Sequence, residues 1–419
     1  MRVDLSFGRK GLPLDLPPGP EYKVFHSISA DPLPDATAAI EAALLNPAAG
    51  PPLGELAKGK RSAAISVCDI TRPAPNTTVL PPVLRTLEAA GVTDIRIMIA
   101  TGLHRLATTA EIRQIVGDDI AARYPVLNHD ARDQDEHRFL GKTKSGTPVW
   151  IDRRFLDADL HMSLGYIEPH LMLGFSGGRK LVAPGLAGQE TIKEIHSSRF
   201  MRDARATEGS IDDNPLHAEL LEIAGIAGHD FLVDVALSRD RRIAQVFAGA
   251  AQAAHRKGVE WVRNAVMQRS EAADAVITSG GGYPLDLTYY QVIKGITAAA
   301  HLVKPGGKIL VVGACEEGVG ALEFRDMVTK YSTGAAFMKA IEGVPVTVDQ
   351  WQLEKLALAA QKAEILYYVP GVPEEFRASL WGTVFNDADS AVRQLMASMP
   401  PSARIAVVPE GPYVLAQAK

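Results

Sequence analysis

The chain has 419 residues, of which 47% are hydrophobic and 22% charged, and its formal net charge is −5. This length exceeds one ordinary hydrophobic core, so we expect at least two domains. The composition is that of a soluble globular protein, and a sequence pI of about 6.1 gives no electrostatic basis for binding nucleic acid.

The two cysteines, Cys68 and Cys315, are too few for a disulfide scaffold or a cysteine-rich zinc site. The N-terminus, MRVDLSFGRKG, has no hydrophobic stretch of signal-peptide length. No apolar run approaches the roughly 20 residues that a transmembrane helix needs. We therefore expect a cytoplasmic protein that binds neither membrane nor nucleic acid.

The first half of the chain alternates between strand-like and helix-like segments. It opens with a short alternating strand at 3–7, Pro-rich turns and a helix at 35–45. The pattern then predicts a helix at 79–91 and strands at 62–70, 94–102, 158–167 and 229–238. Runs of Val, Ile and Ala separated by helices are typical of parallel sheets that are covered on both faces.

A second unit of the same kind follows a connecting helix at 256–269. Its predicted elements are a strand ending in a Gly-rich turn at 273–284, a helix at 287–303, a turn and strand at 304–315, a helix and strand across 348–369 and a last strand at 403–411. We therefore predict an α/β protein of two α/β domains, residues 1–268 and 269–419, with mainly parallel sheets. The default site for small ligands is the interdomain cleft.

The segment from 165 to 196 carries the densest set of reactive side chains. A diglycine, Gly177 and Gly178, is followed two positions later by Lys180, where flexible backbone lets a lysine meet an anionic or electrophilic ligand. His170 precedes this lysine and His196 follows it. Taken alone, a surface lysine and a histidine bonded to helix-end carbonyls are the plain alternatives. The combination favours covalent or metal-assisted chemistry.

Two further motifs of the first half follow predicted strands. CDITRP (68–73) contains Asp69 and Arg72, and ATGLHR (100–105) contains His104. Open α/β sheets bind ligands beyond the carboxyl ends of their strands. An imidazole serves as acid or base near neutral pH, a carboxylate can orient it, and a guanidinium grips carboxylate or phosphate. For Asp69, capping the next helix is the alternative.

The second half contributes YYQVIKG (289–295) and DQW (349–351). Tyr290 and Lys294 are spaced i and i+4 on the predicted helix, and Gln291 and Lys294 are spaced i and i+3. A solvated helix face would explain Gln291 and Lys294, and a core position would explain Trp351.

In order and spacing, these motifs together resemble the signatures of the nickel-pincer lactate racemase family, whose members racemise or epimerise 2-hydroxy acids. The resemblance implies nickel in a pyridinium mononucleotide with sulfur arms, attached covalently to Lys180 through a thioamide. It places Gly177, Gly178, Tyr290 and Gln291 around this cofactor. His196 would complete the nickel coordination, since Ni(II) accepts imidazole nitrogen readily.

The resemblance also assigns the reacting groups. His104 and His170 would be the acid/base pair on opposite faces of the substrate, with Asp69 orienting His104. The substrate would be bound by Arg72, Lys294 and Trp351. The implied reaction is racemisation of lactate, or of a related acid such as malate, by proton-coupled hydride transfer to the cofactor.

The implied partners are the 2-hydroxy-acid substrate and, transiently, the proteins that make the cofactor. Protein made without those enzymes is expected to lack it. Two alternatives stay open. One is a metal-dependent hydrolase built on His104, His170 and His196, which leaves Lys180 without a role. The other is a non-catalytic cofactor-binding homologue, which needs neither acid/base histidine.

Overall fold

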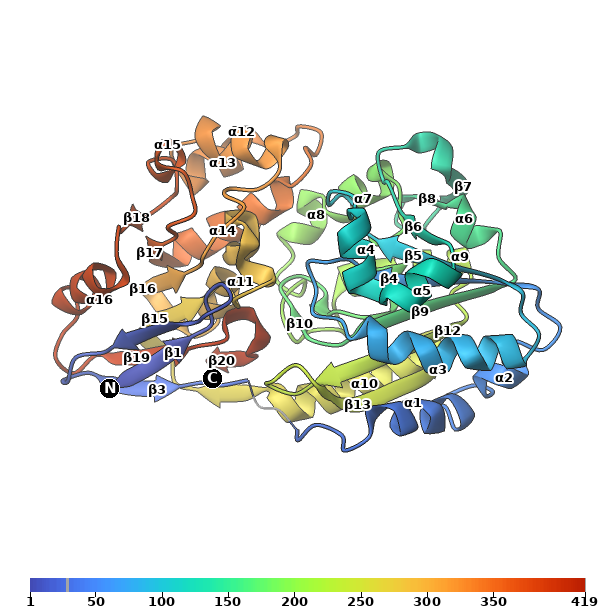
Figure 1. Cartoon of the computed structure of the whole chain (residues 1–419). Helices are drawn as coiled ribbons and strands as arrows, with labels where there is room; N and C mark the ends of the chain where they lie inside the picture. Colours follow the sequence, from blue (N-terminus) through green and yellow to red (C-terminus); the bar gives the residue numbers. More distant parts are fainter. Residues whose placement is uncertain (28–29, 419) are drawn as a thin grey trace.

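The computed structural model describes residues 1–27 and 30–418, and its two main sheets each have six strands (Figure 1). The sheet from the first part of the chain has the order β13-β12-β9-β4-β5-β6. Its strands are β4 (Ser62–Cys68), β5 (Asp94–Ala100), β6 (Val126–Asn128), β9 (Leu160–Tyr166), β12 (Phe231–Leu237) and β13 (Ile243–Ala250). All neighbours are parallel except β12 and β13, which are antiparallel.

The second sheet is parallel throughout, in the order β18-β17-β16-β15-β19-β3. Its strands are β3 (Glu21–Val24), β15 (Ala273–Ser279), β16 (Val303–Val312), β17 (Ala363–Tyr368), β18 (Thr383–Val384) and β19 (Arg404–Val408). Four pairs of short strands complete the set: β1 (Arg2–Leu5) with β2 (Leu12–Asp15), β7 (His137–Lys142) with β8 (Pro148–Asp152), β10 (Pro169–His170) with β11 (Gly174–Phe175), and β14 (Gln268–Ser270) with β20 (Ala416–Ala418).

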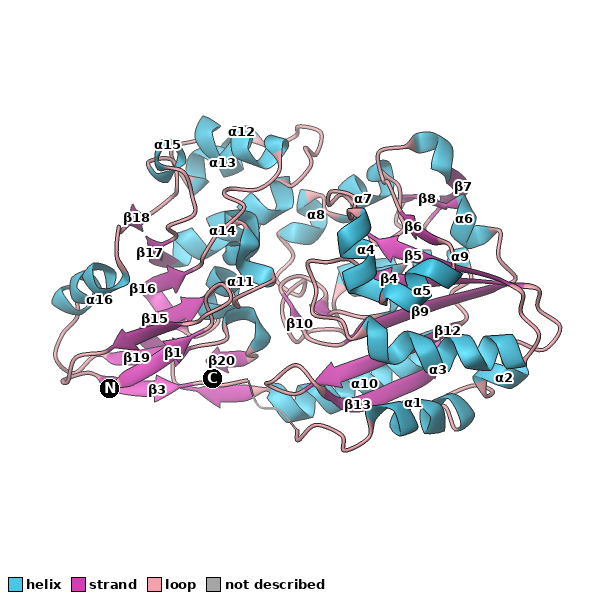
Figure 2. Cartoon of the chain, in the orientation of Figure 1, coloured by secondary structure: helices cyan, strands magenta, loops and turns pink. Residues whose placement is uncertain are grey.

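Helices cover both faces of the first sheet (Figure 2). One face packs on α1 (Ala36–Leu45), α2 (Leu53–Leu56), α3 (Asn76–Ala89), α4 (Thr109–Val116) and α5 (Asp118–Arg123), and the other on α6 (Arg153–Leu156), α7 (Gln189–Ile195), α8 (Ser198–Met201) and α9 (Pro215–Ala227). Strand β4 shows the effect: Ile65 and Val67 enter one core and Ala64 enters the other. A strand buried on both sides reads as a continuous apolar run, which is how SAAISVC appears in the sequence.

The second sheet is covered in the same way. One face packs on α11 (Tyr289–Ala300), α12 (Leu322–Lys330), α13 (Gly334–Ala340), α14 (Gln350–Lys362) and α15 (Glu374–Arg377), and the other on α16 (Ala388–Ala397) and the β1–β2 hairpin. Helix α10 (Ala251–Val266) packs on β12 and β13 and precedes β14. In the described part of the chain, no helix is both long and apolar enough to span a membrane.

The predicted α/β class with mainly parallel sheets is confirmed, and most of the predicted helices and strands are present with small shifts of their ends. The connecting helix predicted at 256–269 lies at Ala251–Val266 and is followed by β14, and the turn predicted before the strand in 304–315 is part of β16. The division of the chain at residue 268 stays a prediction. One strand from before that point, β3, joins the second sheet by pairing with β19. Two of its side chains, Tyr22 and Val24, pack in the core of the second sheet with Leu5, Leu14 and Ile277. The first residues of the chain therefore bury their apolar side chains against the second sheet.

Candidate active site

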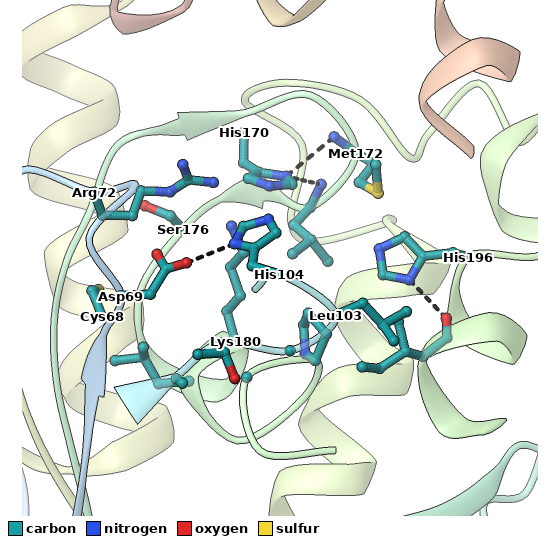
Figure 3. A pocket seen from close by; sticks show the side chains of 18 of the residues that line it. Cys68, Asp69, Arg72, Leu103, His104, His170, Met172, Ser176, Lys180 and His196 are labelled. Carbon is teal, nitrogen blue, oxygen red and sulfur yellow. Dashed lines mark hydrogen bonds and ion pairs between the residues drawn. The ribbon is translucent and has the colours of Figure 1, made fainter. Parts of the chain in front are cut away.

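One cavity gathers most of the residues that the sequence singled out (Figure 3). Its lining comes from loops that follow strands of the first sheet and from helices α11 and α14, which pack on the second sheet. The predicted site residues that line it are Asp69, Arg72, His104, His170, Gly177, Lys180, His196, Tyr290, Lys294 and Trp351. Gly178 and Gln291 are not in this lining.

His104 and Asp69 meet because their strands end at the same edge of the sheet. Cys68 of β4 pairs with Ala100 of β5, so the following loops leave side by side. The His104 Nδ1 lies 2.6 Å from Asp69 Oδ2, and Asp69 Oδ1 accepts a hydrogen bond from Thr71 Oγ1 at 2.6 Å. Burial opposes the charge of Asp69, yet His104 and its other neighbours lower its pKa to about 2. Because the carboxylate only accepts, it fixes the proton of the imidazole on Nδ1 and leaves the Nε2 lone pair free.

Asp69 does not cap the next helix, which was the structural alternative. The N-cap of α3 is Pro75, and no side chain bonds to that helix end. The carboxylate is instead 6% exposed and turned to the imidazole.

His170 is held by main-chain groups. It ends β10, opposite Gly174 of β11, and its Nδ1 accepts hydrogen bonds from the amides of Met172 at 3.4 Å and Leu173 at 3.3 Å. The neutral ring therefore carries its proton on Nε2. Burial lowers the pKa of His170 well below its ordinary value, and the positive charge of Lys180 adds to that effect.

Lys180 lies in a single turn of 3-10 helix, Gly178–Leu181, which begins at the second glycine of the diglycine. Gly177 has a φ of +78°, and a Cβ there would stand 2.6 Å from Oδ2 of the buried Asp234, so a side chain would displace the loop. Burial lowers the pKa of Lys180 to about 7, and Arg72 adds to the shift. The amine is therefore uncharged in a large fraction of molecules near neutral pH, as a nucleophilic or acylated lysine requires.

His196 ends α7 with its Nδ1 2.8 Å from the carbonyl of Ile192. A carbonyl only accepts, so Nδ1 carries the proton and Nε2 has a free lone pair, which is the state of a metal-ligating histidine. Burial lowers the pKa of His196 to about 4, which keeps the ring neutral. The ring of Trp351 lies against it, with centroids 4.4 Å apart.

Two further basic side chains, Arg72 and Lys294, line the cavity. The side chain of Arg72 is 12% exposed, and its Nε is 4.0 Å from Glu168 Oε1. Burial lowers the pKa of Lys294 well below its ordinary value, and Arg72 and Lys180 add repulsion. Glu168 and Asp69 are the acidic groups that oppose this shift.

The two predicted residues outside the lining contact it indirectly. Gln291 is 6% exposed, and its Oε1 accepts a hydrogen bond from Lys294 Nζ at 2.6 Å. Gly178 has a φ of +52° and packs on the ring of His255, where a Cβ would come within 2.8 Å of the imidazole. Gln291 thus holds a cavity residue, whereas Gly178 packs away from the lining, and the contact of either with a cofactor stays a prediction.

A metal site made by the protein alone finds no support. Among residues 1–27 and 30–418, no three His, Cys, Asp or Glu side chains are grouped so as to hold a metal ion. In His170 the amides of Met172 and Leu173 donate to Nδ1 and the ring proton lies on Nε2, so the neutral ring has no free nitrogen for a metal ion. The geometry therefore does not support a metal-dependent hydrolase built on His104, His170 and His196.

Comparison with known proteins now defines the family. The model of the lactate racemase N-terminal domain matches residues 7–209, and that of the lactate racemase C-terminal domain matches residues 268–416. The lactate racemase of Thermoanaerobacterium thermosaccharolyticum is 30% identical over 431 aligned positions that cover 100% of this chain and 99% of that protein. The chain belongs to the lactate racemase family. The lactate racemase of Lactiplantibacillus plantarum is 32% identical over 376 positions, 89% of each chain.

Solved structures agree with this assignment. The lactate racemase apoprotein from T. thermosaccharolyticum superposes with a TM-score of 0.93 at 30% identity, covering 100% of both chains. A protein from Thermotoga maritima matches with a TM-score of 0.72 at 16% identity, over 93% of this chain and 100% of that one, which shows the fold alone.

In this lactate racemase family member, the sequence did not single out several cavity residues: Cys68, Leu103, Tyr166, Met172, Leu173, Ser176, Asp349 and Gln352. Most are apolar or uncharged residues, for which a sequence offers no chemical signal. Asp349 is the exception, because it opens the DQW motif and is ionisable. Its backbone conformation could not be read from the sequence.

Proposed function

We propose that the chain racemises or epimerises a 2-hydroxy acid, with lactate as the first substrate to test. This proposal rests mainly on two histidines that line one cavity and differ in whether Nε2 carries a proton. His104 presents a free Nε2 lone pair, and His170 presents an Nε2 proton. Inverting a carbinol carbon through a planar keto acid needs a proton acceptor for one enantiomer and a proton donor for the other.

The charge of the cavity supports an anionic ligand. The pKa values of Lys180, Lys294 and His170 are each lowered, first by burial and then by neighbours of the same sign. A bound carboxylate or phosphate would favour the protonated forms of these groups and offset the repulsion between them. Arg72 and Lys294 are the groups we assign to the substrate carboxylate, with Trp351 at the pocket wall.

The side chains also fit the cofactor that the family resemblance implies. Lys180 offers a buried amine for a covalent bond, with its pKa lowered to about 7, and His196 offers a neutral imidazole with Nε2 free. When bound, a nickel-pincer pyridinium nucleotide supplies a reversible acceptor for the hydride of the substrate Cα. We assign Gly177, Gly178, Tyr290 and Gln291 to its surroundings.

Protein side chains accept and return the proton of the substrate hydroxyl. His104 takes the hydroxyl proton at Nε2, and Asp69 stabilises the charged ring through Nδ1. On the other face, the proton for the forming hydroxyl would come from the doubly protonated form of His170, because a neutral ring that lost its Nε2 proton would become an anion. In the neutral form the amides of Met172 and Leu173 hold the ring in place. Arg72 and Lys294 hold the carboxylate so that the planar keto acid can be reduced from either side.

The test uses protein made together with the cofactor-biosynthesis proteins. It is incubated separately with enantiopure D- and L-lactate and with a panel of other 2-hydroxy acids, malate included, and chiral chromatography follows optical purity. We expect either enantiomer of the substrate to approach a 1:1 mixture. The intact mass should show an adduct that disappears in Lys180→Ala. Unchanged optical purity for every acid in a protein that carries the adduct would contradict the proposal.

A further inference from the structure

His129 lies at the carboxyl end of β6, the edge strand of the first sheet, and outside the lining of the active-site cavity. The residue is 0% exposed. Its Nδ1 lies 3.0 Å from Asp152 Oδ2, and its Nε2 lies 3.1 Å from the carbonyl oxygen of Ala187. Both nitrogens of one buried ring therefore face oxygen atoms.

Asp152 is an ionised acceptor in this contact. Arg154 donates to its Oδ1 from Nε at 3.0 Å and to its Oδ2 from Nη2 at 2.6 Å, and the amide of Arg154 donates to Oδ1 at 2.9 Å. Burial opposes the charge of Asp152, yet His129 and Arg154 lower its pKa to about 2. A carboxylate and a carbonyl only accept hydrogen bonds, so an imidazole bonded to both carries a proton on each nitrogen.

The other groups around the ring are compatible with this charge. Two cations and two carboxylates meet here, because Arg154 Nη2 also donates to Glu136 Oε2 at 2.7 Å. The ring of His137 stands edge-on to that of His129, with centroids 5.1 Å apart, and its Nδ1 lies 2.7 Å from the carbonyl of Asp133. Burial lowers the pKa of His137 and the charge of His129 adds to that effect, which favours a neutral neighbour. A buried charge is tolerated where it is paired and fully hydrogen-bonded, as it is in His129.

His129 also joins two loops of the active site. Its carbonyl accepts a hydrogen bond from the hydroxyl of Thr101, in the loop that leads to His104. Its Nε2 donates to Ala187, in the segment that follows Lys180. Main chain and ring of one residue thus tie the loop of a predicted acid/base group to the loop of the predicted cofactor lysine.

The two loops also contact each other directly. The amide of Gly102 donates to the carbonyl of Gly185 at 3.1 Å, and the amide of Gly185 donates to the carbonyl of Lys180 at 3.0 Å. Ala187 lies two residues before α7, whose C-cap is His196. A displacement of the segment bonded to the imidazole would therefore reach the loop before α7 and the loop after β5 together.

We propose that His129 is a buried imidazolium that positions the loops of His104, Lys180 and His196. Its second proton lets one ring bond two acceptors, a carboxylate on one side and a carbonyl on the other. A neutral ring would leave one of these buried acceptors without its donor. The effect on catalysis rests on the proposed function, whereas the protonation of His129 and the order of the loops do not.

The protonation is tested in protein without cofactor, so that it can be read whether or not the chain is a racemase. Nitrogen-15 NMR of labelled histidine rings distinguishes a nitrogen that carries a proton from one that does not. At neutral pH the ring of His129 should show two protonated nitrogens. Its signal is assigned by its loss in His129→Gln or, if that variant does not fold, by a nuclear Overhauser contact with the ring of His137. A ring with one protonated nitrogen would overturn the proposal.

The positioning is tested with glutamine variants of two histidines on the same sheet. The control is His161, whose Nδ1 lies 2.8 Å from the carbonyl of Gly228 at the amino end of β9, the end opposite to the active site. In cofactor-free His129→Gln the ring signals of His104 and His196 should shift, whereas in His161→Gln they should stay in place. Signals that stay in place in both variants would contradict the positioning role.

Holo-protein then shows whether the order of the loops matters for turnover. In His129→Gln we expect kcat to fall about 10- to 100-fold with KM within about twofold, because misplaced reacting groups slow the chemical step. His161→Gln should leave kcat unchanged. Asp152→Asn keeps the ring but removes its charged partner, so it should lower kcat in the same direction, and it replaces His129→Gln if that variant does not fold. A lower melting temperature with kcat and both ring signals unchanged would show that His129 is merely structural. If wild-type holo-protein racemises no acid, the proposed function fails and the NMR results still decide the inference.

Discussion

The two acid/base histidines reach one cavity from differently built surroundings. His104 sits in the loop after β5, is 36% exposed, and is bonded through Nδ1 to the side chain of Asp69. His170 sits in the tight β10–β11 turn and is bonded through Nδ1 to the amides of Met172 and Leu173. A carboxylate accepts and an amide donates, so the same ring atom carries a proton in one histidine and a lone pair in the other.

Because of this difference, the two histidines present different groups at Nε2 before any substrate binds. His104 is ready to take a proton at Nε2, and His170 presents an N–H that can donate a hydrogen bond. For the opposite enantiomer the roles reverse, and His170 must then act as the acceptor. That requires the tautomer with the proton on Nδ1, which must give up its hydrogen bonds from the two backbone amides. We therefore expect side-chain changes to disable the His104 side and backbone changes to disable the His170 side.

The largest effect is expected for Asp69→Asn. An amide at this position can donate to Nδ1, which favours the tautomer with the proton on Nε2 and removes the free lone pair of His104. We expect kcat/KM for lactate to fall about 10³- to 10⁴-fold in holo-protein. Thr71→Val removes one hydrogen bond to Asp69 Oδ1 but keeps the carboxylate, and should cost less than about tenfold. A variant with asparagine at 69 that stays within tenfold of wild type would remove Asp69 from its orienting role.

A smaller effect is expected for two basic residues of the cavity, Arg72 and Lys294. Both line it, and both are among the charges that lower the pKa of His170. Arg72→Ala and Lys294→Ala should each weaken transition-state binding by about 2–4 kcal/mol, because a buried charge-assisted contact loses one partner. Steady-state kinetics measures this, and the intact mass checks that the adduct is retained. Wild-type efficiency in both variants would place the carboxylate site elsewhere.

The His170 side is best disturbed through its backbone. Gly174 pairs with His170, has a φ of +75°, and a Cβ there would overlap the carbonyl oxygen of Ser210. Gly174→Ala should lower the free energy of unfolding by about 2–4 kcal/mol. Gly343 has a φ of +69° with no atom within 4 Å of its added Cβ, so Gly343→Ala should cost only about 1 kcal/mol. If denaturant titration gave equal losses of unfolding free energy for Gly174→Ala and Gly343→Ala, the β10–β11 turn would be shown to accept the methyl group without strain.

The sequence predicted the parts of this account that depend on local pattern. Apolar runs such as SAAISVC and DIRIMIA identified central strands, and the loops after them carried Asp69 and His104. The pairing of β3 with β19 joins segments some 380 residues apart and has no local signal. The hydrogen bonds of His170 come from amides, which every residue except proline has. The left-handed backbone of Asp349 likewise depends on packing between distant segments.

The central claim is that His104 and His170 each serve one enantiomer, and single-turnover chemistry tests it most directly. Holo-protein with His104→Ala or His170→Ala is mixed with less than one equivalent of D- or L-lactate and quenched, and the pyruvate formed is measured. Each variant should form pyruvate from one enantiomer only, the two variants should prefer opposite enantiomers, and both should lose steady-state racemisation by about 10²- to 10⁴-fold. Equal pyruvate from both enantiomers in either variant, or racemisation near the wild-type rate, would contradict the account.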